Sequence, residues 1–319
     1  MKRYYTILIL TCFLFLSAEL LVVAADSSTF DERMALYQKT EALTQVPWYY
    51  LAAIDQYERN TSEKSEERIT SITFPDSLWF GLENIDHITD SRIIGLFQGI
   101  GQDGTGNNQA DPMNDEDALY TLAMYIRQYG ITEPDIKIAL WEYYQRSLTV
   151  KTIVQTAKVY RTFNTTELTE HEFPVPLNYN YSYKNTWGDA RGFGGRRIHE
   201  GTDIFAGYGT PVRATSYGVV EIKGWNRYGG WRIGIRDINN TYHYYAHLHG
   251  FSDDLSVGDV VQPGDIIGSV GSSGYGPPGT SGKFPPHLHY GMYKDNGTNE
   301  WAHDPYPSLR AWEKESRNR

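Results

Sequence analysis

The histidines of this 319-residue chain are concentrated in one stretch, because seven of the nine lie between His199 and His303. Polar and apolar residues alternate from His287 to Gly291. Side chains on a β-strand point alternately to its two faces, so this alternation predicts a strand on which His287 and His289 share a face. The stretch therefore indicates a strand-based C-terminal half that brings histidines together.

Three short motifs in this stretch carry groups that bind metals or transfer protons. They supply what a catalytic zinc site requires: three N or O ligands, one open position and proton-handling groups beside it. Any one motif alone would more often be an ordinary core or surface feature, but the ordered set favours a zinc site. The motifs are His199-Glu200-Gly201-Thr202-Asp203, Tyr245-Ala246-His247-Leu248 and His287-Leu288-His289.

This order of motifs, with Gly209 to Val212 after the first and Val257 to Gly264 before the last, closely resembles the lysostaphin-type zinc endopeptidases, peptidase family M23. The resemblance covers roughly residues 187–305. It implies cleavage of peptide bonds in bacterial peptidoglycan and one Zn²⁺ per chain. Carried over by position, it implies the zinc ligands His199, Asp203 and His289 and the catalytic histidines His247 and His287.

The two catalytic histidines are expected to divide the proton chemistry between them. His287 is expected to be the base, and His247 to orient the water or donate to the oxyanion, although these roles could be exchanged. His243 and His249 are expected on the same strand face as His247, near the rim of the site, or else as plain surface histidines.

Short alternating runs separated by Gly, Pro, Asn and Asp predict an all-β, antiparallel plan for the C-terminal half. Together with the resemblance, they predict the antiparallel sandwich of the lysostaphin-type peptidases. Asn239-Asn240 is expected to close a hairpin, and the Gly- and Pro-rich loop 271–286 to form a movable wall of the substrate cleft. The runs span residues 212–222, 231–236, 242–247, 260–270 and 288–293.

Apolar residues at three- to four-residue spacing predict helices in the N-terminal half, at 32–43, 48–57, 117–129 and 135–145. Residues 46–60, 95–98, 103–118 and 139–144 are similar to motifs of the lysozyme-like lytic transglycosylases. This resemblance implies an all-α lysozyme-like domain with Glu58 as general acid. Two features argue against that activity: Tyr144 stands where the family has an asparagine, and the charge of Arg59 could keep Glu58 ionised.

The length of the chain predicts two domains. Residues 1–25 have the charged start, apolar middle and small-residue exit of a signal peptide, or form an uncleaved N-terminal anchor. The other predicted parts are a helical lysozyme-like domain at 26–165, a linker rich in Asn, Tyr, Pro and Ser at 166–186, a zinc endopeptidase domain at 187–306 and a C-terminal tail at 307–319.

The net charge and the cysteine content limit the possible binding partners of the chain and its cellular location. A formal net charge of -10 argues against a nucleic-acid partner. The single cysteine, Cys12, lies in the N-terminal apolar run, so the mature chain contains no disulfide framework. We therefore expect export to the cell wall or extracellular space, including the outer forespore or a membrane-anchored position. Peptidoglycan is the expected partner, and no protein partner can be inferred.

The predicted function is a zinc-dependent peptidoglycan endopeptidase acting on stem peptides. The pairing of a helical half with this peptidase resembles the sporulation L-Ala–D-Glu endopeptidases, which implies that bond in the spore cortex. The alternatives are a bifunctional wall hydrolase with glycosidase activity from Glu58, and a non-catalytic wall-binding or activator protein. A biotinyl or lipoyl carrier would require a lysine at an exposed hairpin tip, which the sequence does not clearly offer.

Overall fold

The computed structural model describes residues 29–62, 68–192 and 196–319. The chain divides into two compact units, residues 1–52 with 64–139 and residues 53–63 with 140–319, which we call the helical unit and the β-rich unit. The predicted signal peptide, residues 1–25, lies outside the described residues. Within the described ranges, no helix combines the length and the apolar character that a membrane span requires.

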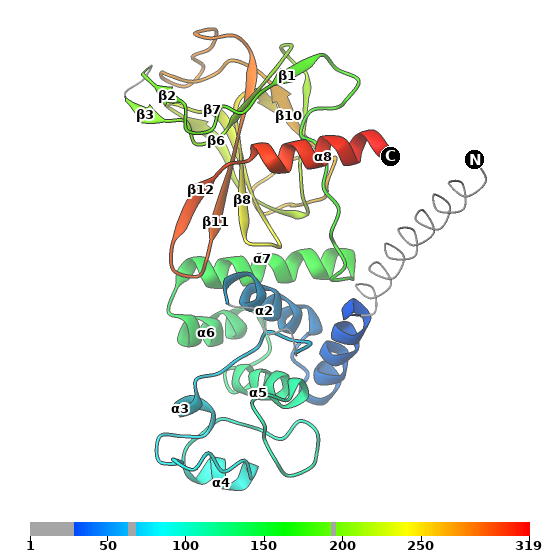
Figure 1. The fold of residues 1–319 in the computed structure, drawn as a ribbon, viewed down its shortest axis with the longest axis vertical. Helices are drawn as coiled ribbons and strands as arrows, with labels where there is room; N and C mark the ends of the chain where they lie inside the picture. Colours follow the sequence, from blue (N-terminus) through cyan, green and yellow to red (C-terminus); the bar gives the residue numbers. More distant parts are fainter. Residues whose placement is uncertain (1–28, 63–67, 193–195) are drawn as a thin grey trace, which may run out of the picture. The chain divides into compact units, whose positions relative to one another are not determined.

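The helical unit follows the predicted spacing of apolar residues. It contains a helix over residues 29–44, the start of α2 (Trp48–Thr61), α3 (Asp76–Trp79), α4 (Ser91–Leu96), α5 (Asp115–Arg127) and most of α6 (Glu133–Tyr144) (Figure 1). The side chain of Asn114 caps α5 by accepting hydrogen bonds from the backbone N–H groups of Glu116 and Asp117. The N-terminal region is thus helical, as predicted, and its likeness to lysozyme stays a prediction.

The β-rich unit contains one branched antiparallel sheet (Figure 1), which confirms the predicted antiparallel arrangement. Its strands run in the order β1-β4-β11-β8-β7-β6-β9, while β10 joins β8 to β5 and β12 lies on β11. A separate pair consists of β2 and β3. The strands are β1 (Tyr181–Tyr183), β2 (Ala190–Arg191), β3 (Arg197–Ile198), β4 (Thr202–Ala206), β5 (Pro211–Arg213), β6 (Gly218–Asn226), β7 (Gly230–Asp237), β8 (Thr241–Phe251), β9 (Val260–Val261), β10 (Ile266–Val270), β11 (His287–Asp295) and β12 (Glu300–His303).

Alternation along the strands produces the core of this unit. On β11, Leu288 and Tyr290 are fully buried in the apolar core, whereas His287 and His289 point to the opposite face. Asn240, in the left-handed conformation with φ 60°, closes the turn between β7 and β8 as the sequence predicts. The sheet therefore has one apolar face that holds the fold together and one face that carries the histidines.

Two segments outside the strands also contribute to this core. Phe173 and Val175 are fully buried among the strand residues, although they belong to the segment predicted as a linker. Leu309 and Trp312 of α8 (Tyr306–Asn318) are buried there as well, although 307–319 was expected to be a tail. Because they are three residues apart, they lie on one face of the helix. Both segments are rich in polar residues, so their composition did not predict that these four apolar residues are buried.

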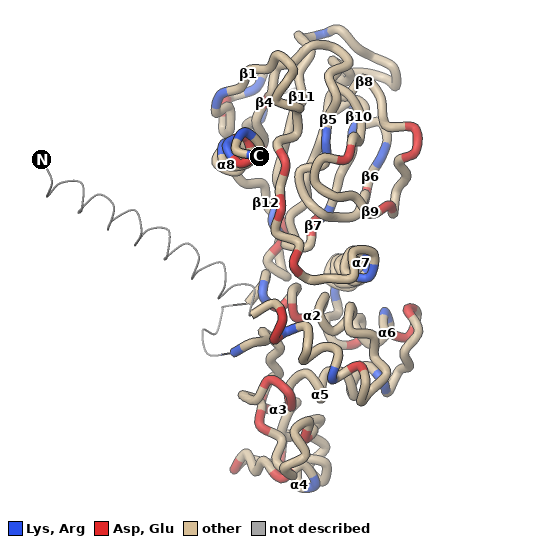
Figure 2. The backbone as a smooth tube through the Cα atoms, turned by 90° about the vertical axis from the view of Figure 1, so that its right-hand side faces the viewer, with Lys and Arg blue, Asp and Glu red and all other residues tan. Residues whose placement is uncertain are grey.

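Helix α7 (Ser147–Phe163) packs against β6, β7 and β9, beside the end of the sheet (Figure 2). The Nζ of Lys158 donates to the carbonyl oxygen of Gly258 at 2.6 Å, and Lys151 pairs with Glu221 at 3.2 Å. The predicted boundary after residue 165 assigns α7 to the helical domain, but its contacts assign it to the β-rich unit. Helical periodicity predicts an apolar face but not the element that packs against it, so the sequence could not show to which unit α7 belongs.

Candidate metal centre and catalytic site

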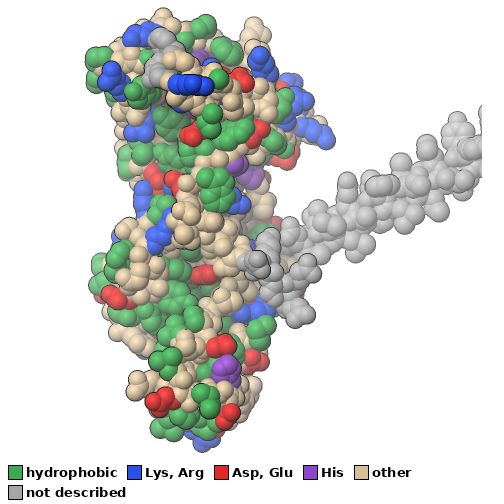
Figure 3. All heavy atoms as spheres, turned by 60° about the vertical axis from the view of Figure 1, so that its left-hand side comes forward, with side chains coloured by type: hydrophobic (Ala, Val, Ile, Leu, Met, Phe, Trp, Pro, Cys, Tyr) green, Lys and Arg blue, Asp and Glu red, His purple; other side chains and the backbone are tan. Residues whose placement is uncertain are grey.

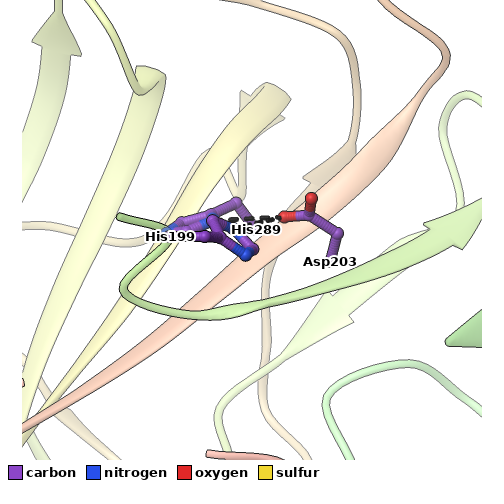
Figure 4. A group of neighbouring side chains, drawn as sticks. All are labelled: His199, Asp203 and His289. Atoms are coloured by element: carbon purple, nitrogen blue, oxygen red, sulfur yellow. Dashed lines mark hydrogen bonds and ion pairs between the residues drawn. The ribbon is translucent and has the colours of Figure 1, made fainter. Parts of the chain in front are cut away.

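Three side chains from two of the motifs meet where β4 pairs with β11 (Figure 4). Asp203 on β4 and His289 on β11 are direct partners in the strand register, and His199 immediately precedes the turn into β4. His199 Nε2 lies 2.9 Å from His289 Nδ1 and 3.0 Å from Asp203 Oδ1, and His289 Nδ1 lies 3.2 Å from Asp203 Oδ1. Strand pairing therefore brings together residues that are 86 positions apart in the chain.

The spacing of these three atoms fits a zinc ion. Atoms with these separations of 2.9, 3.0 and 3.2 Å lie about 1.8 Å from the centre of their triangle, which is less than the Zn–N and Zn–O bond lengths of about 2.0–2.2 Å. A zinc ion held by these three atoms would keep a fourth coordination position open. Two imidazoles and one carboxylate are also a donor set that zinc accepts in catalytic sites.

Neighbouring groups fix the orientation of the ligand atoms. His199 Nδ1 lies 2.8 Å from the carbonyl oxygen of Thr186, which turns Nε2 toward His289 Nδ1 and Asp203 Oδ1. Arg191 Nη2 donates to Asp203 Oδ2 at 2.6 Å, so Oδ1 is the oxygen that faces the two histidines. Both ligand side chains on this side, His199 and Asp203, are buried.

The electrostatics favour the metal-binding protonation states. Burial alone would raise the pKa of Asp203, but hydrogen bonds from His199 and His289 hold that pKa well below its usual range. Burial lowers the pKa of His289, so its imidazole is neutral. The carboxylate is therefore anionic and the imidazole neutral at physiological pH.

Gly201 makes room for the His289 ring, and Gly201→Ala should lower metal affinity about 10- to 100-fold by displacing that ring. A Cβ at this position would lie 2.6 Å from His289 Cε1 and 2.7 Å from the carbonyl oxygen of Tyr290. Competition with a chromogenic chelator measures the affinity. Gly207→Ala is the matched control, because its Cβ would meet only Thr210 Oγ1 at 3.7 Å. Equal affinities of the two variants would contradict this role of Gly201.

His247 and His287 lie beside the three metal-binding groups, with a distance of 4.9 Å between their ring centroids. Their Nδ1–H groups donate to the carbonyl oxygens of Ser273 at 2.8 Å and Pro285 at 2.9 Å, which leaves both Nε2 atoms as acceptors. His287 Nε2 is 3.6 Å from Asp203 Oδ1. Burial, together with the nearby histidines, lowers the pKa of His247 to about 3, and burial also lowers the pKa of His287. Both are therefore neutral imidazoles able to accept a proton.

A β-bulge in β8 directs His247 toward this site. Trp231 on β7 pairs with Leu248 and Ile233 pairs with Tyr245, so β8 contains one extra residue between these partners. His247 sits in this bulge with a left-handed φ of 62°. Because one extra residue reverses the faces of a strand, His247 points to the site while Tyr245 points to the core.

His243 and His249 were expected on the same strand face as His247, near the rim of the site. For His243 this expectation is wrong. This residue lies before the bulge and faces the core, where it contacts Asp237 Oδ2 at 2.9 Å and the Tyr290 hydroxyl at 2.6 Å. His249 is exposed and packs edge-to-face against Tyr208. The reversal of faces at the bulge separates these histidines, and periodicity alone could not predict it.

These groups open into a pocket of about 560 Å³. The five predicted residues all line it, together with six aromatic side chains and four further charged side chains. The aromatic residues are Phe205, Tyr228, Tyr244, Tyr275, Phe284 and Tyr293, and the charged residues are Arg191, Arg197, Glu200 and Lys283.

The sequence profile of peptidase family M23 matches residues 197–305. The L-Ala–D-Glu endopeptidase of Bacillus subtilis (strain 168) is 60% identical over 289 residues, which cover 89% of each chain. The chain belongs to peptidase family M23. Lysostaphin of Staphylococcus staphylolyticus is 38% identical over 115 residues, 36% of this chain and 22% of lysostaphin. The solved catalytic domain of lysostaphin from Staphylococcus simulans is 34% identical and covers 44% of this chain and 99% of that domain, with a TM-score of 0.35.

Several residues that line the pocket of this M23 metallopeptidase lie outside its histidine motifs, so the motifs did not predict them. Arg191, which orients Asp203, comes from β2, before the first motif. Tyr275 and Phe284 come from the loop 271–286, so this loop forms a wall of the pocket, while its predicted movement stays a prediction. The chain contains 25 tyrosines, but this count does not say which of them line a pocket.

Proposed function

We propose that this peptidase is a zinc-dependent peptidoglycan endopeptidase that cleaves the L-Ala–D-Glu bond of stem peptides. The observation that carries this proposal is the 60% identity to the Bacillus subtilis L-Ala–D-Glu endopeptidase over 89% of both chains. An alignment of that length includes the helical unit as well as the catalytic one. Lysostaphin, by comparison, is similar to this chain only over 36% of it.

In the proposed mechanism His199, Asp203 and His289 hold one Zn²⁺ per chain. A bound zinc ion polarises the scissile carbonyl and lowers the pKa of its water. His287 would take the proton from the attacking water, because its Nε2 lies 3.6 Å from Asp203 Oδ1, beside the proposed metal ligands. His247, fixed by Ser273, presents its own Nε2 to the pocket and orients the water or stabilises the oxyanion.

The proposal includes the setting in which the enzyme works. Residues 1–25 direct export, with or without cleavage, to the cell wall, where peptidoglycan is available as substrate. The outer forespore is the corresponding place during sporulation. The helical unit then acts as a wall-positioning part, and the β-rich unit is the catalytic part.

Mass spectrometry of purified peptidoglycan after digestion tests the proposed bond. We expect stem peptides with a new amino-terminal D-Glu and glycan strands that retain L-Ala, and we expect both products to disappear after metal chelation. Cleavage at another bond would contradict the assigned specificity. Binding to the wall without turnover would favour the alternative of a non-catalytic wall-binding or activator protein.

Glycosidase activity from Glu58 is the alternative that one observation favours: burial raises the pKa of this carboxyl group, as a general acid requires. Arg59 pairs with Asp55 at 2.9 Å, so it does not keep Glu58 ionised as the sequence suggested. The carboxyl group of Glu58 nevertheless accepts hydrogen bonds from the Tyr144 hydroxyl and from Ser62 Oγ. These partners favour a structural role for Glu58.

Glu58→Gln should therefore leave the peptide products unchanged, and neither this variant nor the wild type should release glycan fragments. The amide keeps an oxygen that accepts from Tyr144, so the change is structurally mild. Chromatography of reduced glycan products is the measurement. Glycan fragments from the wild type that vanish in Glu58→Gln would establish the bifunctional alternative.

A further inference from the structure

One end of the catalytic pocket carries two cations that are attached to the same tyrosine. Arg197 Nη2 donates to the Tyr275 hydroxyl, and the Arg197 guanidinium lies 5.6 Å from the centre of the Tyr275 ring. Lys283 Nζ donates to the Tyr275 carbonyl oxygen at 2.7 Å. Both cations line the pocket and are exposed to solvent. Tyr275 therefore holds two positive charges at one place on the pocket wall.

Tyr275 also fixes the position of these charges relative to the catalytic histidines. Its ring is stacked on His247 with 6.0 Å between centroids and 21° between planes, and it meets Phe284 edge-to-face. Its backbone is left-handed, with φ 56°, a conformation that non-glycine residues adopt mainly where surrounding contacts impose it. The ring of Tyr275 therefore lies between the two cations and the catalytic histidine His247.

The acidic groups of the pocket are directed elsewhere. Asp203 faces the metal-binding histidines through Oδ1 and Arg191 through Oδ2. Glu200 is near Tyr293, where burial and then this negative charge raise the pKa of the tyrosine to about 12. In the upper part of the view in Figure 3, Lys and Arg side chains (blue) and a little histidine (purple) are visible among hydrophobic and acidic side chains. Because the acidic groups of the pocket have other partners, the end that carries Arg197 and Lys283 is its positive end.

We propose that Arg197 and Lys283 bind a free carboxylate on the substrate residue next to the scissile bond. This inference rests on the proposed function, because a glutamyl residue that continues the peptide through one carboxyl group keeps the other one free and charged. Charge-assisted hydrogen bonds to arginine and lysine recognise such a group, and the partly enclosed pocket strengthens them. The two cations would then distinguish glutamate from its amide and from the glycine bridges of other wall peptides.

The test uses two synthetic peptides that contain the L-Ala–D-Glu bond and differ only in the free glutamyl carboxylate, which is a carboxamide in the second. The full-length zinc-loaded enzyme should cleave the acid with a kcat/KM about 10- to 100-fold higher than the amide. Arg197→Gln and Lys283→Gln should each lower kcat/KM for the acid and leave the amide nearly unaffected. Lys314→Gln, on the exposed side of α8, is the control and should retain the full preference.

The outcomes separate this inference from the proposed function. Equal cleavage of acid and amide by the wild type would overturn the carboxylate site while the assigned bond stands. An equal loss of both activities in Arg197→Gln and Lys283→Gln, at unchanged zinc content, would show that these side chains support the loop rather than bind the carboxylate. Failure to cleave the L-Ala–D-Glu bond in either peptide would instead contradict the proposed function.

Discussion

His289→Ala should lose both zinc and peptidase activity, whereas His287→Ala should retain zinc and lose activity. His289 Nδ1 is within 3.2 Å of the other two proposed ligand atoms, so its removal leaves too few ligands for a catalytic zinc site. His287 presents its Nε2 as a proton acceptor, and the loss of a general base typically lowers kcat about 10²- to 10⁴-fold. Metal analysis and a peptide-cleavage assay on the same preparations measure the two effects.

His249→Ala is the matched control for this pair. His249 is exposed and contacts Tyr208 rather than the metal-binding groups, so the variant should keep both zinc and activity. Equal zinc loss in His289→Ala and His287→Ala would mean that the roles within the His-x-His motif are assigned wrongly.

Arg146→Ala should destabilise the β-rich unit by about 3–5 kcal/mol, because it leaves a buried carboxylate without its cationic partner. Asp295 at the end of β11 is fully buried, and Arg146 binds both of its oxygens, at 2.7 and 2.8 Å. Asn240 Nδ2, which donates to the Asp295 backbone oxygen at 2.9 Å, cannot neutralise the charge. Denaturant unfolding followed by tryptophan fluorescence measures the change in the free energy of unfolding.

Arg310→Ala provides the comparison for this substitution. Arg310 pairs with Glu313 at 3.6 Å on the surface of α8, with 62% of its side chain exposed, so its loss should cost much less than the loss of Arg146. A shift of the same size in both variants would show that the Arg146 pair is no more important than a surface ion pair. The double variant Arg146→Ala with Asp295→Ala should be less destabilised than two independent changes would predict, since neither charge is left alone.

The part of the site that lies on β11 could be predicted, because the histidines recur every two residues and the side chains of a strand return to the same face every two residues. In His287-Leu288-His289 the two-residue alternation that buries Leu288 also directs both histidines to the pocket. The pairing of His289 with Asp203 across β11 and β4 then completes the metal-binding group. No feature of the sequence states that register, and the family resemblance supplied the ligand residues without the strand pairing.

The parts that could not be predicted depend on single residues or on distant partners. One extra residue in β8 reverses the face of His247 relative to His243, and no periodic pattern records such a bulge. Phe173 and Val175 are core residues in a segment whose composition indicates a linker. Arg191 reaches Asp203 from a two-residue strand, which is too short for any pattern to reveal.

The central claim is that His199, Asp203 and His289 hold the catalytic zinc, and an anomalous difference map recorded at the zinc absorption edge tests it most directly. In crystals of the zinc-loaded protein, we expect a single strong peak within about 2.0–2.2 Å of His199 Nε2, Asp203 Oδ1 and His289 Nδ1. The same crystals of His289→Ala should lack the peak. A peak bound instead by His247 and His287, or one that persists in His289→Ala, would contradict the account.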